Sequence, residues 1–342
     1  MKRSVTVVTT AVLALGLAGL PACSSDKGGS ASADSDTTIA VSTTAASEQR
    51  SVERTDGSEP QIEGAFNVAP TVKIPNADLD VGSSGVVIEG DGAVVGGTDR
   101  LVAQLGAYRL ADAAVVGASW LDTVPVMFQL GGDAIAPAIS DQLVGATVGS
   151  RIWLVTTAGE TGGGGKAVGQ TGGAARAEPG DKVVLVVDVL AAYGPASVVE
   201  GTAAAAPAGY PVYSDGEPPT VSAATVAAPA VAEVHELIAG AGPALELGQA
   251  VVVQYVMTEW DTGKTVDSTW ASRGGPMFLT LGRGMLPVAV EYNLLGKPAG
   301  SRQLVVVPPS TDGTINFPPA LGLDETKTYA VTFDILDVID GA

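Results

Sequence analysis

The sequence predicts an α+β fold with two tandem copies of one domain, each an antiparallel β-sheet wrapped around one short helix. The copies are visible in residues that recur 150 positions apart, such as Trp120 with Trp270 and Gln104 with Gln254. Within each copy, β-branched and apolar runs surround one short segment of helical periodicity. A repeat this long that occurs only twice indicates two globular domains rather than a solenoid.

The expected strands are runs rich in β-branched and apolar residues, and they occur at matching places in the two copies. In the first copy they cover residues 99–110, 151–157 and 182–190, and in the second copy residues 249–260, 302–308 and 327–336.

The expected helix of each copy is an apolar stripe with a spacing of four residues. The stripe residues are Ile135, Ile139 and Leu143 in the first copy, and Leu286, Val290 and Leu294 in the second. Pro137 and Pro287 lie near the helix starts, where a missing N–H has little cost. Gly145 and Gly296 follow the stripes and predict the helix ends.

The amino-acid composition of the remaining segments separates a tether and a linker from the two domains. Residues 23–65 are rich in Ser, Thr, Ala, Asp and Glu and lack aromatic residues, which predicts a disordered tether. Residues 193–231 include a low-complexity piece and are interpreted as a linker and leading segment. The two domains are therefore expected over residues 66–192 and 232–342.

Charge and residue counts exclude several classes of function. The net charge of −19 would repel phosphate backbones, so no nucleic-acid partner is expected. Cys23 and His235 are the single cysteine and the single histidine of the chain. These counts exclude a thiol pair, a Cys/His zinc site and a catalytic triad built on a second histidine. We expect no metal and no cofactor.

The N-terminus has the pattern of a secretory signal. Lys2 and Arg3 precede an uncharged apolar stretch, and Ala22 is a small residue at its end. A transmembrane anchor is the alternative, but about 17 apolar residues are at the short limit for a span. The position of Cys23 resembles the lipobox of bacterial lipoproteins. That resemblance implies a signal peptide over residues 1–22, acylation of Cys23, and a protein exported and lipid-anchored to the outer face of the cytoplasmic membrane.

The second copy contains a series of short motifs in a fixed order. They are Tyr255, Gly263, Val266-Asp267-Ser268, Leu281-Gly282, Gly300, Val307-Pro308-Pro309 and Phe333-Asp334. This series resembles the FKBP-type peptidyl-prolyl cis-trans isomerases. That family has a Tyr at the end of a long strand, a turn with Gly, Phe-Asp-Ser, and Leu-Gly before a helix. A Gly, a basic strand, two prolines and a closing Phe-Asp follow. The resemblance covers most of residues 232–339, and the first copy shares it mainly by repeating the second.

The resemblance implies a site that acts on proline-containing polypeptides. Tyr255 would line a cup for the proline ring, Phe333 would form a wall, and Asp267 would orient a hydrogen bond near the substrate carbonyl. The residues expected to contact substrate are Val266, Met277, Leu286, Pro287 and Val290. Rotation about the X-Pro bond crosses a barrier of about 18–20 kcal/mol. An apolar cup with a polar rim suffices for it, without nucleophile or metal.

The second copy also departs from the family at this site. Val266 replaces the usual Phe, Val290 replaces the Trp floor, and Pro287 lacks an N–H that the family uses. The expected Tyr after residues 307–309 is absent, and Asp312 is nearest. These changes predict a shallower cup that binds proline more weakly.

The first copy has lost more of the site. Leu105, Gly117, Ile139 and Val187 occupy its Tyr, Asp, Trp and Phe positions, so it has neither rim carboxylate nor aromatic wall. Three functions therefore stay open. They are a surface-anchored isomerase that assists folding of exported proteins, a catalytically faded binding or chaperone module, and a structural lipoprotein whose aromatic residues are ordinary core.

Overall fold

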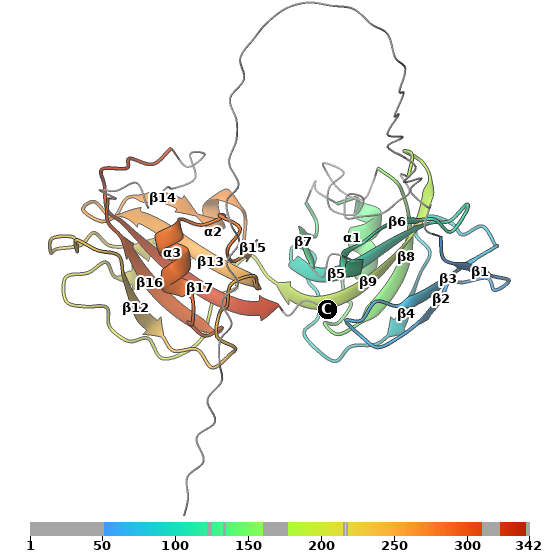
Figure 1. The fold of residues 1–342 in the computed structure, drawn as a ribbon, viewed down its shortest axis with the longest axis horizontal. Helices are drawn as coiled ribbons and strands as arrows, with labels where there is room; N and C mark the ends of the chain where they lie inside the picture. The colour runs from blue at the N-terminus through green and yellow to red at the C-terminus, as the bar shows by residue number, and fades with distance from the viewer. Residues whose placement is uncertain are drawn as a thin grey trace, which may run out of the picture. The chain divides into compact units, whose positions relative to one another are not determined.

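The computed structural model describes residues 51–121, 125–132, 135–159, 177–214, 216, 218–309 and 322–339 (Figure 1). The expected signal peptide over residues 1–22, the expected acylation site Cys23 and Asp312 lie outside these ranges. Within them, no helix has both the length and the apolar character needed to span a membrane.

The N-terminal domain contains a six-stranded antiparallel sheet with the order β4-β8-β9-β5-β6, in which β7 also pairs with β5. Its strands are β4 (Ser84–Ile88), β5 (Arg100–Arg109), β6 (Val115–Ala118), β7 (Val126–Gln129), β8 (Arg151–Thr157) and β9 (Lys182–Tyr193).

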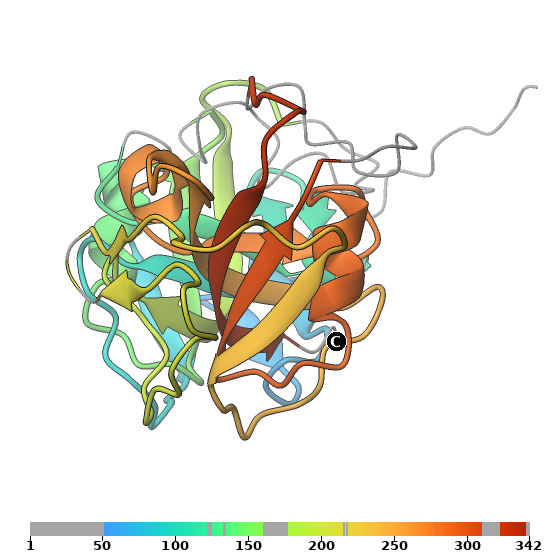
Figure 2. The ribbon, with the colours of Figure 1, turned by 90° about the vertical axis from the view of Figure 1, so that its left-hand side faces the viewer.

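The C-terminal domain repeats this sheet strand for strand. The order is β12-β16-β17-β13-β14, with β15 pairing with β13, and its strands cross the domain in Figure 2. The strands are β12 (Glu233–Ile238), β13 (Ala250–Glu259), β14 (Thr265–Ser268), β15 (Met277–Thr280), β16 (Ser301–Val307) and β17 (Tyr329–Ile339). The predicted α+β class and the predicted repeat are both confirmed.

One seven-residue helix packs against each sheet, as expected: α1 (Pro137–Leu143) and α3 (Val288–Leu294). Among the described residues, each domain also has one shorter helical turn, the 3₁₀ turn η1 (Ser119–Leu121) in the first and α2 (Thr269–Ser272) in the second. Gly145 and Gly296 follow the two longer helices with φ of +85° and +76°. This left-handed conformation favours glycine and ends both helices.

The predicted tether was too long. Residues 51–65 belong to the N-terminal domain, because β1 (Glu53–Thr55) and β2 (Gln61–Glu63) both pair with β3 (Thr71–Pro75). Ile62 and Ile74 pack on Trp153 on the sheet face opposite α1. Three-residue strands have little local signal, and this small sheet forms because the larger sheet offers it an apolar surface.

The predicted linker over residues 193–231 was also partly wrong. It contains the hairpin β10 (Tyr213–Ser214) and β11 (Thr220–Val221). Tyr210 from this segment packs edge-on against Trp260, with ring centroids 4.9 Å apart. The segment therefore covers the C-terminal sheet and belongs to the C-terminal domain. Residues 51–75 belong to the N-terminal domain in the same way.

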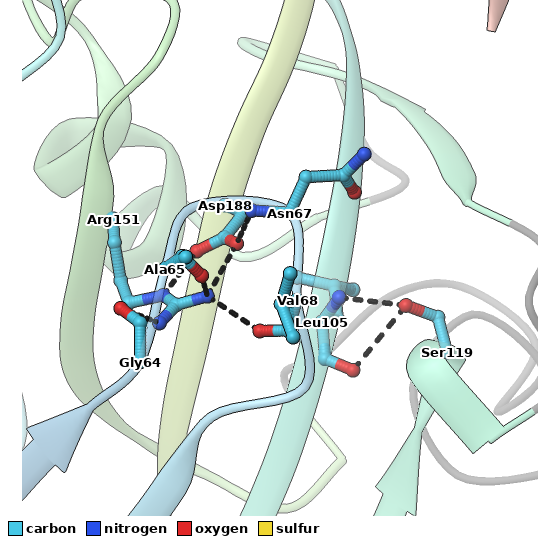
Figure 3. Close-up of polar contacts among 8 residues, drawn as sticks. All are labelled: Gly64, Ala65, Asn67, Val68, Leu105, Ser119, Arg151 and Asp188. Carbon is cyan, nitrogen blue, oxygen red and sulfur yellow. Dashed lines mark hydrogen bonds and ion pairs between the residues drawn. The ribbon is translucent and has the colours of Figure 1, made fainter. Parts of the chain in front are cut away.

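In the N-terminal domain, residues 51–75 form the covering segment, and a buried ion pair connects this segment to the sheet (Figure 3). The Arg151 Nε atom lies 2.6 Å from the Asp188 Oδ1 atom, and both side chains are fully buried. The guanidinium group also donates to the carbonyl oxygens of Gly64, Ala65 and Val68. The backbone N–H of Asn67 donates to the second Asp188 oxygen at 2.8 Å. Every charge taken out of water thus gains partners, which a buried pair requires.

The C-terminal domain has the same arrangement. Arg302 Nε lies 2.6 Å from Asp334 Oδ1, and the N–H of Val199 donates to Asp334 Oδ2 at 3.0 Å. The Tyr213 ring lies against the guanidinium group, 4.0 Å from Cζ to centroid. Gln254 adds hydrogen bonds to backbone oxygens of the same covering segment. The folded unit therefore begins near residue 195, well before the first strand of its large sheet.

We predict that Arg302→Met strongly destabilises the C-terminal domain. The substitution leaves the buried Asp334 carboxylate without its charge partner, a change that typically costs about 3–5 kcal/mol. Native-state hydrogen exchange measured by mass spectrometry should show faster exchange in β16 and β17. Amides of β8 and β9 serve as the internal reference.

Lys73→Met is the matched control, because it breaks an exposed ion pair with Glu53 whose side chains are 39% and 75% exposed. Exposed pairs contribute little to stability. Equal exchange rates of β16 and β17 in the two variants would contradict the role of the buried pair.

Candidate functional site

The two central strands of the C-terminal sheet bring the expected aromatic pair together. In the antiparallel register Tyr255 on β13 stands opposite Phe333 on β17. Their ring centroids are 5.4 Å apart, with an angle of 44° between the planes. The neighbouring register of β13 and β14 places Asp267 opposite Met257. The Tyr255 hydroxyl group donates a hydrogen bond to Asp267 Oδ2.

The other expected residues surround this pair. Leu286 and Val290 belong to the same apolar cluster as Tyr255 and Phe333, and Val266 and Met277 pack against it. Pro287 is buried directly before α3, where it acts as the N-cap residue without a side-chain cap. The structure thus gathers all eight expected site residues around one end of the helix and the central strands.

Burial separates the floor of this cluster from its rim. Tyr255, Val290 and Phe333 are 5%, 0% and 1% exposed, whereas Val266, Asp267 and Met277 are half-buried. Access from solvent is therefore at the edge formed by Val266, Asp267 and Met277. The fully buried Val290 makes a small floor, since an aromatic ring would bring far more surface.

The carboxylate of Asp267 is held by three donors. Its Oδ1 atom accepts from the N–H of Ser268 at 2.8 Å and from the hydroxyl of Ser272 at 2.9 Å. Its Oδ2 atom accepts from Tyr255. A carboxylate fixed in this way is a preorganised negative charge at the rim, whose orientation costs nothing at the moment of binding.

Two hydroxyl residues of this site were not anticipated from the sequence, Ser272 and Thr269. The Thr269 hydroxyl accepts from the backbone N–H of Tyr255 at 3.1 Å and donates to Gln254 Oε1 at 2.7 Å. The N-terminal domain has the same contacts, in which Ser119 bonds to Gln104 and Leu105. The recurring Gln, with a hydroxyl 15 residues later, is the signal that would have found Thr269.

Electrostatics at the rim act on Tyr255. The pKa of its hydroxyl is raised to about 12, with burial as the largest cause and the hydrogen bond and negative charge of Asp267 acting in the same direction. The phenol therefore stays protonated at physiological pH and remains a donor to the carboxylate.

The N-terminal domain presents the corresponding positions without this chemistry. Leu105 stands opposite Val187, as Tyr255 stands opposite Phe333, and Gly117 stands opposite Ala107. Ile139 of α1 packs in the same cluster. The registers show that these positions are the structural equivalents of the C-terminal site, with neither aromatic ring nor carboxylate.

Among the described residues, no group of three His, Cys, Asp or Glu side chains is placed to hold a metal ion. His235 lies on β12, where its Nε2 atom is 3.1 Å from Glu233 and its ring packs edge-on against Tyr210. It belongs to the packing of the covering segment and makes no contact with the Tyr255–Asp267 pair.

Comparison with known proteins identifies the same part of the chain. Residues 242–312 match the family model for FKBP-type peptidyl-prolyl cis-trans isomerases. An FK506-binding protein of Streptomyces anulatus is 31% identical over 80 residues, which are 23% of this chain and 64% of that protein. The chain thus spans slightly less than two thirds of this relative. The FKBP-type resemblance of the second copy is confirmed.

Solved structures give weaker similarities. The three FKBP domains of wheat FKBP73 show 15% identity and a TM-score of 0.28, over 75% of this chain and 94% of that one. FkpA of Escherichia coli shows 20% identity and a TM-score of 0.25, over 32% of this chain and 46% of that one. With scores this low, the fold assignment rests on strand order and register.

We predict that Asp267→Asn lowers the pKa of Tyr255 from about 12 without returning it to 10. Removing the negative charge makes the phenolate less unfavourable, but burial remains and is the larger cause. The ¹³Cζ resonance of labelled tyrosine, followed by NMR against pH, measures the change. A pKa that does not move would show that the carboxylate and the phenol are not coupled.

Proposed function

We propose that this chain is a peptidyl-prolyl cis-trans isomerase whose activity resides in the C-terminal domain, and that it assists the folding of exported proteins. The observation that carries the proposal is that strand register, a ring contact and a hydrogen bond join the rim carboxylate of Asp267 to the buried rings of Tyr255 and Phe333. The match of residues 242–312 to the family model supports it.

The proposed mechanism uses no covalent step. Phe333 and Leu286 provide apolar surface for the proline ring. This surface also removes water from the X-Pro bond. Because solvation by water favours the planar amide, removing that water makes the twisted bond relatively less unfavourable. Asp267, held by three donors, sets a fixed charge at the rim beside the substrate carbonyl. Such a field stabilises the altered charge distribution of the twisted bond more than that of the planar bond, and this difference lowers the barrier.

The second candidate function is a binding or chaperone module without catalysis. It is favoured by the fully buried Val290 in place of an aromatic floor, and by Pro287, which offers no N–H to a substrate carbonyl. A module of this kind would bind proline-containing peptides at the rim and leave their isomerisation rate unchanged.

We further propose that acylation of Cys23 anchors the chain to the outer face of the cytoplasmic membrane, with the following residues up to 50 as the tether. The proposal rests on the basic and apolar residues before Cys23. Two or more acyl chains together bind membranes stably, whereas a single chain does not.

Cys23→Ser is expected to abolish anchoring, because serine has no thiol to carry the lipid. The variant should move from the membrane pellet to the soluble fraction in cell fractionation, and it should lose incorporation of radiolabelled palmitate. A variant that stays in the pellet and keeps its label would contradict the anchor.

A protease-coupled prolyl assay on the full chain tests catalysis. We expect acceleration over the uncatalysed rate, and a loss of about tenfold or more in kcat/KM for Asp267→Ala and for Phe333→Leu. Phe333→Leu is preferred to Phe333→Ala, since deleting a buried ring costs about 3–5 kcal/mol of stability.

Val187→Ala in the N-terminal domain is the matched control, because Val187 is the structural equivalent of Phe333 in a domain without the rim carboxylate. Its kcat/KM should equal that of the wild type. Full activity in both C-terminal variants would refute the site, and peptide-induced NMR shifts without acceleration would favour the binding module.

A further inference from the structure

Glu291 is a buried acidic residue that the proposed mechanism does not use. It lies in the first turn of α3, directly after Val290 of the cup floor, and it is only 7% exposed. A carboxylate removed from water needs hydrogen-bond donors that replace the lost solvation. Its Oε1 atom accepts the backbone N–H of Gly282 at 2.7 Å, a distance typical of the strong hydrogen bonds that charged groups form.

This hydrogen bond joins α3 to the segment that connects β15 with the helix. We call residues 282–287 the wall segment, because it contains Leu286 and Pro287. The backbone N–H of Glu291 also donates to the carbonyl oxygen of Pro287 at 3.0 Å. One residue therefore holds the wall segment at both ends, through its side chain at Gly282 and through its backbone at Pro287.

The wall segment contains two residues that adapt easily to other backbone conformations. Gly282 and Gly284 have φ of +83° and +69°. Glycine populates this region and several others at similar cost, so the sequence of the segment alone does not fix its path. Leu286, by contrast, is 9% exposed and packs in one cluster with Tyr255 and Phe333. The position of this part of the cup therefore depends on how the wall segment is held.

The N-terminal domain lacks the corresponding hydrogen bond. The repeat aligns Gly282 with Gly131 and Glu291 with Ser140. Ser140 is 5% exposed, and its hydroxyl has no hydrogen-bond partner among the described residues. The helix α1 nevertheless packs against its sheet through an apolar cluster. Packing of the helix on the sheet thus does not require a glutamate at this position, and the glutamate occurs in the domain that contains the candidate site.

We propose that Glu291 is a positioning residue for the candidate site, which acts through Gly282 to hold Leu286 where the proline ring of a substrate packs. This inference rests on the proposed isomerase function, because that function assigns Leu286 to the proline-binding surface. A wall segment that is free to move is competent to bind for only a fraction of the time, and the apparent affinity for substrate falls by that fraction. Preorganisation by Glu291 thus strengthens binding at a cup whose floor is small.

The test compares Glu291→Met with Glu291→Gln in the full chain. Met is close to Glu in length but cannot accept the N–H of Gly282, whereas Gln keeps an acceptor oxygen. Gly282 is exposed, so water can take over its N–H and the Met variant is expected to fold. For a tetrapeptide with one proline, Glu291→Met should raise KM about tenfold and leave kcat within about twofold of the wild type. Glu291→Gln should keep KM within about threefold of the wild type.

The amide of Gly282 reports the contact independently of activity. A hydrogen bond to a carboxylate shifts an amide proton downfield. The ¹H resonance of Gly282 should therefore move upfield in Glu291→Met and move less in Glu291→Gln. A Gly282 resonance that is the same in all three proteins would overturn the inference.

Glu259→Met is the matched control, because it makes the same substitution at another acidic residue of the C-terminal domain. Glu259 is 8% exposed, and its partners Lys327 and Thr262 lie outside the candidate site. Both KM and kcat should equal those of the wild type. An equal rise of KM in Glu259→Met and Glu291→Met overturns the inference, and so does a loss in Glu291→Met that is confined to kcat.

A failure of the proposed function gives a different result. A wild-type chain that binds the tetrapeptide without accelerating its isomerisation refutes the isomerase, and the Kd from an NMR titration then takes the place of KM. A Kd that is weakened in Glu291→Met and kept in Glu291→Gln supports the positioning role in a binding module. A Kd that is unchanged in Glu291→Met refutes that role, and a wild-type chain that does not bind the tetrapeptide refutes both.

Discussion

The fold of each domain depends on one buried arginine–aspartate pair between two adjacent central strands. In the N-terminal domain Arg151 and Asp188 have no exposed surface, so their charges are tolerable only because backbone groups complete their hydrogen bonding. Those groups come from the covering segment before the sheet. The pair joins β8 to β9, and it also needs the covering segment, because that segment supplies the backbone groups that complete its hydrogen bonding. The covering segment is therefore a necessary part of the fold.

The same strand carries the pair on one face and the site on the other. Phe333 and Asp334 are neighbours on β17, and alternate residues of a strand point to opposite faces. Phe333 lies in the cluster with Tyr255, while Asp334 binds Arg302 and the covering segment. The ion pair of Asp334 with Arg302 thus helps to fix the position of Phe333 from the opposite face of the sheet, away from the candidate site.

Much of the fold was predictable because the central strands are covered on both faces. Strands buried on two sides read as continuous apolar runs, and β5 and β13 are of this kind. The strands over residues 51–75 escaped prediction because they are short and depend on contacts distant in sequence. At the site, the family resemblance grouped Tyr255 with Asp267 and Phe333, and the strand register is the structural reason that they meet. The role of Ser272 depends on the turn α2, whose geometry no residue pattern specifies, whereas Thr269 could have been found from its spacing to Gln254, which recurs as Ser119 and Gln104.

The covering segments change what was duplicated in this protein. Each copy consists of a leading segment and a sheet, over residues 51–193 and 195–339, and each leading segment supplies a backbone N–H to the aspartate of its own ion pair. The N-terminal unit has the buried ion pair, while the positions equivalent to Tyr255 and Asp267 hold Leu105 and Gly117. The ion pair that completes the fold therefore does not require the residues of the candidate site.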